Sequence, residues 1–273
     1  MSENENLLLR LRQSVDGYSR TQQKLGEFVL SDPAKVVYLT ITELARESGT
    51  SEASVTRLCR TLGCKGNEFK MALALDLRQV QFVEHGGDEI DNVVNESVQA
   101  IQDTAKLLDR ALLEAAALAL HQAQSVQIYG VAASAILGEY LHYKLLRLGK
   151  PAQLFSDMHR AAMNATTLSK NTFVVAISSS GSTRDLLHVV KLARKQGVRV
   201  LALSNTPRSP LASLSDIQLV AAKPEGPLSA GALTAKVGVM LLVELLTTSL
   251  IALDDQYSEV SQKTASATLP LLL

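Results

Sequence analysis

The chain has 273 residues, with 27 Lys and Arg against 27 Asp and Glu, so its formal net charge at pH 7 is zero. This length exceeds that of an ordinary single domain, and we expect two domains. Zero net charge excludes a general attraction of the whole chain to polyanions, so any affinity for nucleic acid must come from a local surface.

The first residues, MSENENLLLR, are polar and acidic and lack the basic stretch and long apolar core of a secretory signal. We therefore expect a cytoplasmic protein. Cys59 and Cys64 have neither the CxxC spacing nor the neighbouring His residues of a zinc site. We expect two reduced, packed thiols, no metal and no cofactor.

From the N-terminus to residue 83 the apolar residues recur at helical spacing, with breaks at DGYS, SDP and ESGTS. This pattern predicts an all-α domain over residues 1–83. The polar segment EHGGDEIDN contains adjacent glycines and is the predicted linker, residues 84–92.

Within the first domain, LTITELARESGTSEASVTRLCRTLG predicts two helices around a tight corner. Thr40 and Glu43 fit a capping box, Gly49 suits the left-handed residue that ends the first helix, and Thr50 or Ser51 can cap the second. The residues of the second helix that share an inward-facing side are Val55, Leu58, Cys59 and Leu62. This pattern matches a helix-turn-helix module.

Arg57 and Arg60 fall on the opposite side of the second helix. The planar guanidinium of Arg can grip phosphate or read guanine, so we assign this side to DNA binding. Ser54, Lys65 and Lys70 extend the predicted DNA-binding surface. Exposed arginines are also common on ordinary paired helices, and the spacing alone leaves that alternative open.

After the linker, short apolar runs alternate with longer amphipathic segments. The strand-sized runs are VQIYGV, AQLF, TFVVAI, RVLALS and IQLVAA. They predict an α/β domain over residues 93–273, with a five-stranded parallel sheet flanked by helices. The apolar stretch 237–253 is long enough to consider as a membrane span, but Glu244 at its centre favours a buried core helix.

The segment AISSSGSTRDLL follows one of these strands and opens a helix. At the carboxyl end of a parallel strand, a helix N-terminus presents free N–H groups to an anion. The predicted phosphate-binding residues are Ser178, Ser180, Ser182 and Thr183, with Gly181 allowing close backbone approach. The alternative is a polar loop in which one serine caps the helix.

A similar junction, IYGVAAS, follows the first strand and places Ser134 near the next helix start. The chain has neither GxGxxG at this point nor a P-loop pattern, which disfavours dinucleotides and nucleoside triphosphates. A site rich in hydroxyls and poor in metal ligands suits a sugar phosphate.

Taken together, SEASVTRLCRTLGCKG and ISSSGSTRDLL resemble the RpiR family of bacterial transcriptional regulators, which join an N-terminal helix-turn-helix domain to a C-terminal sugar isomerase (SIS) domain. The resemblance covers nearly the whole chain and departs from the family pattern at GCKGNEFK. It implies that a sugar phosphate held at the SIS site changes how paired DNA-binding domains bind an operator. Because a sensor domain is joined to a DNA-binding domain, we expect a homodimeric repressor of sugar catabolism genes that the ligand releases from DNA, with no membrane association.

By the same resemblance, the residues that hold the phosphate are Ser134, Ser178, Ser180 and Thr183, and those that contact the rest of the sugar are His159 and Lys236. Regulators of amino-sugar and sialic acid catabolism that sense N-acetylmannosamine 6-phosphate are the suggested type. We expect no enzyme activity. The alternative is a SIS-type isomerase or lyase, whose acid–base candidates are Glu139, His159, His188 and Glu225.

Overall fold

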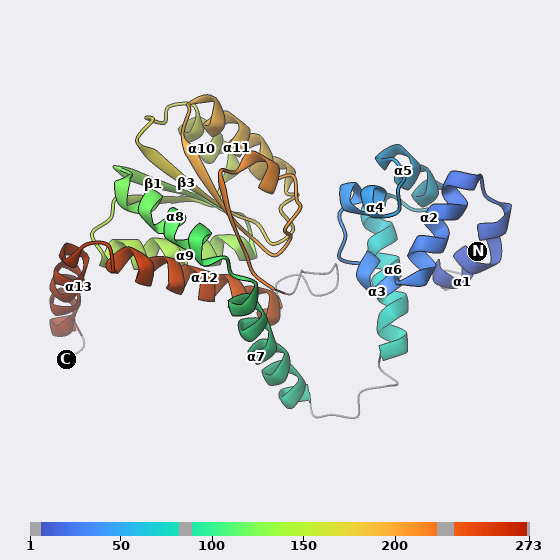
Figure 1. Ribbon diagram of the computed structural model, residues 1–273, viewed down its shortest axis with the longest axis horizontal. Helices are drawn as coiled ribbons and strands as arrows, with labels where there is room; N and C mark the ends of the chain where they lie inside the picture. The colour runs from blue at the N-terminus through green and yellow to red at the C-terminus, as the bar shows by residue number, and fades with distance from the viewer. Residues whose placement is uncertain (1–6, 82–88, 223–231, 272–273) are drawn as a thin grey trace. The chain divides into compact units, whose positions relative to one another are not determined.

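The computed structural model describes residues 7–81, 89–222 and 232–271 (Figure 1). The chain divides between Asn92 and Val93 into two compact units, the first helical and the second α/β. The predicted fold class is therefore confirmed. Helix α7 begins at Glu89, inside the segment predicted as a linker, and residues 84–88 lie outside the described residues.

The N-terminal unit is built from short helices around a core of its own. They are α1 (Leu7–Ser14), the 3₁₀ turn η1 (Val15–Gly17), α2 (Arg20–Ser31), α3 (Pro33–Val36), α4 (Ile41–Glu47), α5 (Glu52–Thr61) and α6 (Gly66–Gln81). Four of these helices contribute buried side chains to this core: Leu11 of α1, Leu25 of α2, Leu58 of α5, and Phe69 and Leu73 of α6. Burial of these side chains fixes α5 against α2 and α6.

The corner between α4 and α5 has the predicted geometry. Thr40 Oγ1 accepts the N–H of Glu43 at 3.1 Å, and the Glu43 carboxylate accepts the N–H of Thr40 at 2.8 Å. Gly49 has a φ of +63°, and Ser51 caps α5 by accepting the N–H of Ser54. The predicted inward-facing residues of α5 are buried. Local capping therefore defines the start of α4, the turn and the start of α5.

The C-terminal unit holds a five-stranded parallel sheet in the order β2-β1-β3-β4-β5. Its strands are β1 (Ser125–Tyr129), β2 (Ala152–Phe155), β3 (Thr172–Ile177), β4 (Arg199–Ser204) and β5 (Ile217–Val220). Every strand-sized run named above forms one of them. The strand order reverses between β1 and β3, which creates a topological switch point.

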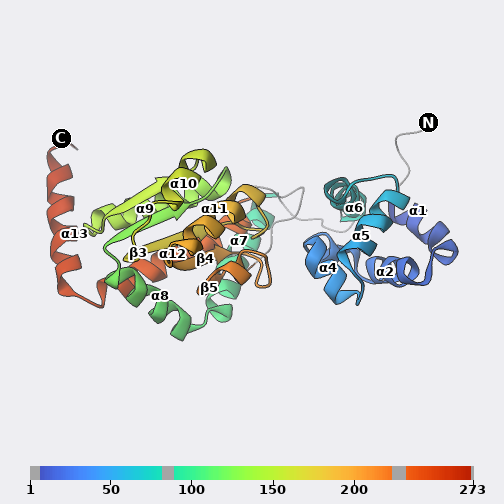
Figure 2. The same cartoon turned by 90° about the horizontal axis from the view of Figure 1, so that it is seen from above.

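Helices cover both faces of this sheet (Figure 2). On one face lie α8 (Arg110–Gln122), α9 (Ala133–Arg147) and α12 (Leu233–Ile251), and on the other α10 (Met158–Ala165) and α11 (Arg184–Lys195). The 3₁₀ turn η2 (Ala212–Leu214) precedes β5.

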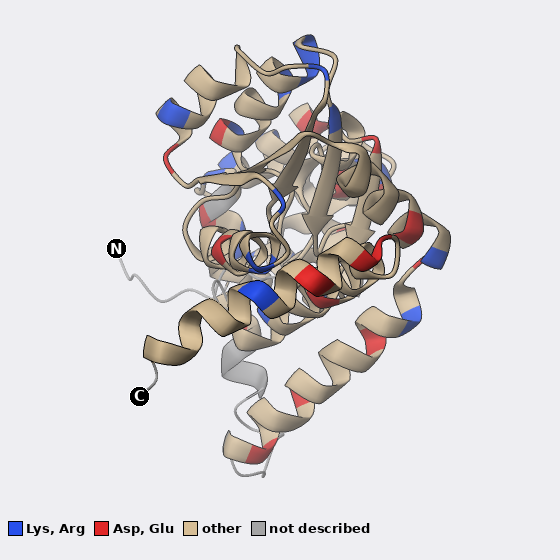
Figure 3. Cartoon of the chain, turned by 90° about the vertical axis from the view of Figure 1, so that its left-hand side faces the viewer, with Lys and Arg blue, Asp and Glu red and all other residues tan. Residues whose placement is uncertain are grey.

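Two further helices lie at the ends of this unit. Helix α7 (Glu89–Leu107) precedes α8, and α13 (Asp255–Thr268) follows α12 and leads into the turn η3 (Leu269–Leu271). Helix α13 has no buried residue and contacts α9 through Thr264 Oγ1, which donates to the carbonyl of Arg147 at 3.0 Å. Beyond Lys263 the helix carries no charged residue (Figure 3).

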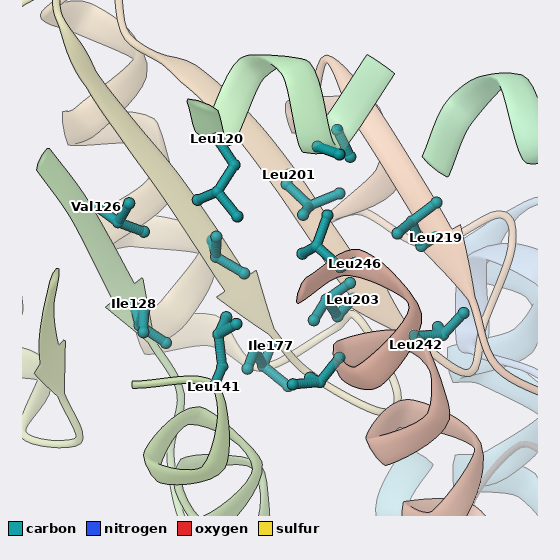
Figure 4. Packing of buried hydrophobic residues seen from close by; sticks show 14 of the residues in the cluster. Leu120, Val126, Ile128, Leu141, Ile177, Leu201, Leu203, Leu219, Leu242 and Leu246 are labelled. Atoms are coloured by element: carbon teal, nitrogen blue, oxygen red, sulfur yellow. The ribbon is translucent and has the colours of Figure 1, made fainter. Parts of the chain in front are cut away.

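Helix α12 is a core helix, although by length and composition it could cross a membrane, the one such helix in the described residues. Half of its most apolar window is buried (50%). Figure 4 shows Leu242 and Leu246 of α12 beside strand residues such as Leu203. Glu244 accepts hydrogen bonds from Tyr140 and Lys144, which lower the pKa of its carboxyl.

Both cysteines are free, and Cys59 lies in the core of the N-terminal unit. Burial raises the pKa of the Cys59 thiol to about 12 and also raises that of Cys64. Protonated thiols are poor nucleophiles and poor metal ligands. Among the described residues, no group of three or more His, Cys, Asp or Glu side chains is placed to hold a metal ion.

The capping box gives a stability prediction. The substitution Thr40→Ala removes the acceptor of the Glu43 N–H and should lower the free energy of unfolding by about 1 kcal/mol. Thr56→Ala, at an exposed position within α5, is the matched control and should change it by less than about 0.5 kcal/mol. Urea denaturation followed by circular dichroism measures both, and equal losses would contradict the capping role.

Candidate functional site

The carboxyl ends of β1 and β3 lie side by side at the switch point, where open α/β sheets bind ligands. Helix α9 follows β1 and α11 follows β3, and the two pack on opposite faces of the sheet. Neither Ala132 nor Thr183, the N-cap residues of these helices, makes a side-chain capping bond. Two helix N-termini therefore present backbone donors at this edge.

The loop after β3 is folded around the side chain of Ser178. Its Oγ accepts the N–H of Gly181 at 3.1 Å and lies 3.2 Å from Thr183 Oγ1. Gly181 has a φ of +59°, and a Cβ added there would lie 2.1 Å from Ser209 Oγ. Only glycine fits this position, which keeps the predicted phosphate-binding residues Ser178 and Thr183 together.

Ser180 and Ser182 form the outer part of the same loop. Ser180 is exposed and its Oγ accepts the N–H of Ser182 at 3.2 Å, while Ser182 Oγ donates to the carbonyl of Ser180 at 3.2 Å. Their hydroxyls brace the loop in this structure, whereas that of Ser178 lies beneath it.

The turn after β1 is equally tight. A Cβ on Gly130 would lie 2.9 Å from the carbonyl oxygen of Ser134, and Ala132 has a φ of +49°, the one positive value of a non-glycine residue in the described part of the chain. Such conformations occur where surrounding structure enforces them, and they cluster at ligand sites. The turn places Ser134, 9% exposed, at the sheet edge that also carries the β3 loop.

Lys236 brings a positive charge to the loop from the first turn of α12. It is 9% exposed, and its Nζ donates to Ser179 Oγ at 2.9 Å. Sequence reasoning identified Lys236 but missed Ser179. Ser179 lies in a bend just beyond the end of β3, between two serines assigned to phosphate, and the sequence carries no signal that its hydroxyl meets Lys236.

His159 lines a cleft of about 720 Å³ beside the start of α11. Asp157, Asp185 and His188 line it as well, and Val131 links it to the turn after β1. The Asp157 carboxylate accepts the N–H groups of Arg160 and His159, which lower its pKa. Neither aspartate was predicted from the sequence: Asp157 reads as the N-cap of a short helix, and Asp185 as an ordinary acidic residue in the first turn of α11.

The predicted DNA-binding residues separate into exposed and buried groups. Arg57, Arg60 and Lys65 are exposed. Ser54, 2% exposed, differs from expectation because it turns toward the N-cap of α5, and Arg57 Nη2 donates to its Oγ at 3.2 Å. Lys70 is half-buried, and burial lowers the pKa of its ammonium group. The negative charge of Glu43 acts in the other direction, but its effect is smaller.

Comparison with protein families gives two matches, one in each unit. The helix-turn-helix domain of the rpiR family matches residues 5–80, and the SIS domain matches residues 119–249. An HTH-type transcriptional regulator of Caldanaerobacter subterraneus subsp. tengcongensis is 30% identical over 250 residues, covering 88% of this chain and 89% of that protein. The chain belongs to the RpiR family.

This RpiR regulator is also similar to a solved structure, described as the Vibrio vulnificus NanR protein complexed with ManNAc-6P. The two are 44% identical, with a TM-score of 0.89 over 97% of this chain and 99% of that one. The bifunctional protein glk of Burkholderia thailandensis is 31% identical over 217 residues, which are 76% of this chain and 34% of glk. The similarity to the Caldanaerobacter regulator and to NanR thus extends over nearly the full length of the chains compared, whereas the similarity to glk covers only about a third of glk.

The close approach at Gly181 can be tested by substitution. Gly181→Ala adds backbone strain and an overlap with Ser209, and should lower the free energy of unfolding by about 2–5 kcal/mol. Gly197→Ala is the matched control, because Gly197 has a φ of +77° and an added Cβ would meet only Lys170 Cε, at an ordinary contact distance of 4.0 Å, and it should cost about 1–2 kcal/mol. Equal costs in urea denaturation would show that the Ser209 contact does not decide the loop conformation.

Proposed function

We propose that this chain is a repressor of amino-sugar catabolism genes that binds operator DNA as a homodimer in the cytoplasm and releases it when a sugar phosphate fills the SIS site. The observation that carries the proposal is the loop at residues 178–183, which joins hydroxyls, helix N-termini and a buried lysine at the switch point. It occurs in a chain whose other unit is a helix-turn-helix domain.

A phosphate group fits this edge without a metal ion. Ser134, Ser178 and Thr183 supply hydroxyl donors from two neighbouring strand ends. Lys236 supplies a full positive charge, and the starts of α9 and α11 supply partial ones. Together these groups can balance most of the charge of a phosphate dianion.

The rest of the ligand would occupy the cleft that His159 lines. Its volume of about 720 Å³ suits a small molecule. Asp157, His159 and Asp185 offer acceptors and donors for sugar hydroxyl and amide groups. Similarity to NanR complexed with ManNAc-6P supports N-acetylmannosamine 6-phosphate as the ligand and sialic acid catabolism as the regulated pathway.

DNA recognition is assigned to α5. Arg57 and Arg60 are exposed on this helix, and Lys65 follows it. Ser54 would act indirectly, because its hydroxyl accepts a hydrogen bond from Arg57 and restrains that side chain. A helix-turn-helix dimer reads two half-sites about one helical turn apart, so a palindromic operator is expected.

A second copy of the chain is the proposed partner of an exposed apolar surface on α9. Ile136 and Leu146 are 65% and 63% exposed, and Tyr143 is 52% exposed. Leu269 and Leu271 extend the exposed apolar side chains beyond the end of α13, which itself packs on α9. Large exposed apolar side chains gathered on neighbouring elements are typical of interaction surfaces.

The alternative is a sugar-phosphate isomerase or lyase. His159 and His188 line the same cleft, which is the one observation in its favour. Glu139 is not among the residues that line this cleft, and Glu225 lies outside the described residues. We infer binding without turnover, and conversion of N-acetylmannosamine 6-phosphate by the purified protein would favour the enzyme.

Arg57→Ala and Arg60→Ala should each weaken binding to DNA from the promoter region beside the gene of this protein by about tenfold, since each removes a phosphate or base contact. Arg12→Ala, exposed on α1, is the matched control and should bind normally. Gel-shift titration at about 50 and 200 mM salt should also show a steep loss of affinity. Normal binding by both variants would reject the assigned surface.

Ser178→Ala should weaken N-acetylmannosamine 6-phosphate binding by about 10–100-fold, because a buried donor to a charged group is lost. Isothermal titration calorimetry measures the change. Ser215→Ala, at a half-buried serine bonded to the Leu211 carbonyl, should bind the ligand normally.

In gel-shift titrations N-acetylmannosamine 6-phosphate should release the wild-type protein from DNA. Tighter DNA binding in the presence of this ligand would contradict a repressor that the ligand releases.

A further inference from the structure

The phosphate-binding loop is joined to the end of β4 through Ser179. The carbonyl oxygen of Ser179 accepts the N–H of Asn205 at 3.0 Å and the hydroxyl of Thr206 at 3.1 Å. Its Oγ accepts Lys236 Nζ at 2.9 Å. All four residues are at most 9% exposed, so water does not substitute freely for these bonds. A movement of Ser179 therefore acts on Asn205 and Lys236 together.

Asn205 in turn joins β5 to α12. Its Nδ2 donates to the carbonyl of Ala222, just beyond β5, and to that of Ala235, in the first turn of α12, both at 3.0 Å. Ala235 immediately precedes Lys236. One side chain thus fixes the start of the helix that carries the lysine relative to the end of a strand.

Thr104 of α7 also contacts Ala222, through the backbone N–H of that residue. It is 0% exposed, and its Oγ1 accepts the N–H of Ala222 at 2.9 Å while donating to the carbonyl of Ala100 at 2.7 Å. A Cβ added at Gly238 of α12 would lie 2.6 Å from this Oγ1. Helix α7, the end of β5 and the start of α12 therefore touch with no room between them.

Helix α7 begins at Glu89, after α6 ends at Gln81, and from Val93 onward it belongs to the C-terminal unit, of which it is the first element along the chain. Its first residues have exposed side chains, with Ile90 at 70% and Val93 and Val94 each at 53%. Its anchoring in this unit therefore depends on buried residues farther along, among them Ala100 and Thr104. A shift at Thr104 is transmitted along a rigid helix toward the segment that leads to the DNA-binding unit.

We propose that Asn205 and Thr104 are positioning residues that couple occupancy of the sugar-phosphate site to α7. A phosphate that bonds Ser178 and attracts Lys236 changes the balance of forces at Ser179, and the hydrogen bonds through Asn205, Ala222 and Thr104 carry that change to α7. The ligand then favours one position of α7 over another, which is the differential affinity that any effector requires. This inference rests on the proposed function.

Thr104→Val tests the coupling, because it keeps the shape of the side chain and removes the acceptor of the Ala222 N–H. Thr104→Ser restores the hydroxyl. Thr247→Val is the matched control, since Thr247 is equally buried and its hydroxyl bonds only within α12, to the carbonyls of Val243 and Glu244. Operator affinity is measured for each protein with and without saturating N-acetylmannosamine 6-phosphate.

Wild-type protein should show an affinity ratio in the range of about 5–150-fold, which is usual for allosteric coupling. Thr104→Val should reduce this ratio below about threefold while binding the ligand within about threefold of wild type. Thr104→Ser and Thr247→Val should retain the ratio. If Thr104→Val keeps the affinity ratio of the wild type, or if Thr247→Val loses the ratio to the same extent, the coupling is overturned. If the ligand does not change the DNA affinity of the wild-type protein, the proposed function itself is overturned.

Hydrogen exchange of wild-type protein gives a second readout that does not depend on a variant folding. Addition of N-acetylmannosamine 6-phosphate should change amide exchange in residues 97–107 as well as in residues 178–183. Binding that alters the loop at 178–183 but leaves exchange throughout α7 unchanged overturns the coupling.

Discussion

The reversal of strand order between β1 and β3 is the constraint on which the ligand site depends. Because α9 and α11 follow neighbouring strands and pack on opposite faces of the sheet, both helices begin at this one edge, and neither N-cap residue makes a side-chain capping bond. The tight turns at Gly130 and Gly181 then hold serines from separate parts of the chain at that edge. The strand order thus determines where these hydroxyl side chains come together, at the edge of the sheet next to the switch point.

In both units, positively charged side chains are held in place by hydroxyl groups. The chain is neutral overall, yet Arg57, Arg60 and Lys65 lie on and after α5, and Lys236 lies beside the loop at residues 178–183. Each group is aligned by a hydroxyl, Ser54 for Arg57 and Ser179 for Lys236. A hydroxyl partner orients a cation without neutralising its charge.

The sequence predicts most of the fold because its signals are local. Apolar runs coincide with all five strands, and the Thr40–Glu43 capping box and Gly49 define the helix-turn-helix corner. The hydrogen bonds at Ser179 and Thr104 join residues 57 and 118 positions apart, and no periodicity or motif reports such pairs. Burial of Ser54 and Lys70 was missed for a related reason, since exposure depends on neighbours as much as on helical phase.

The position of Lys236 also bears on sensitivity to the metabolite. A free lysine side chain gives up about 2 kcal/mol of rotamer freedom when it is fixed. Here that loss accompanies folding, because the ammonium group donates a hydrogen bond to Ser179 within the folded unit. In the proposed site a sugar phosphate meets an ordered cation rather than a mobile one, and such preorganisation lowers the entropic cost of binding.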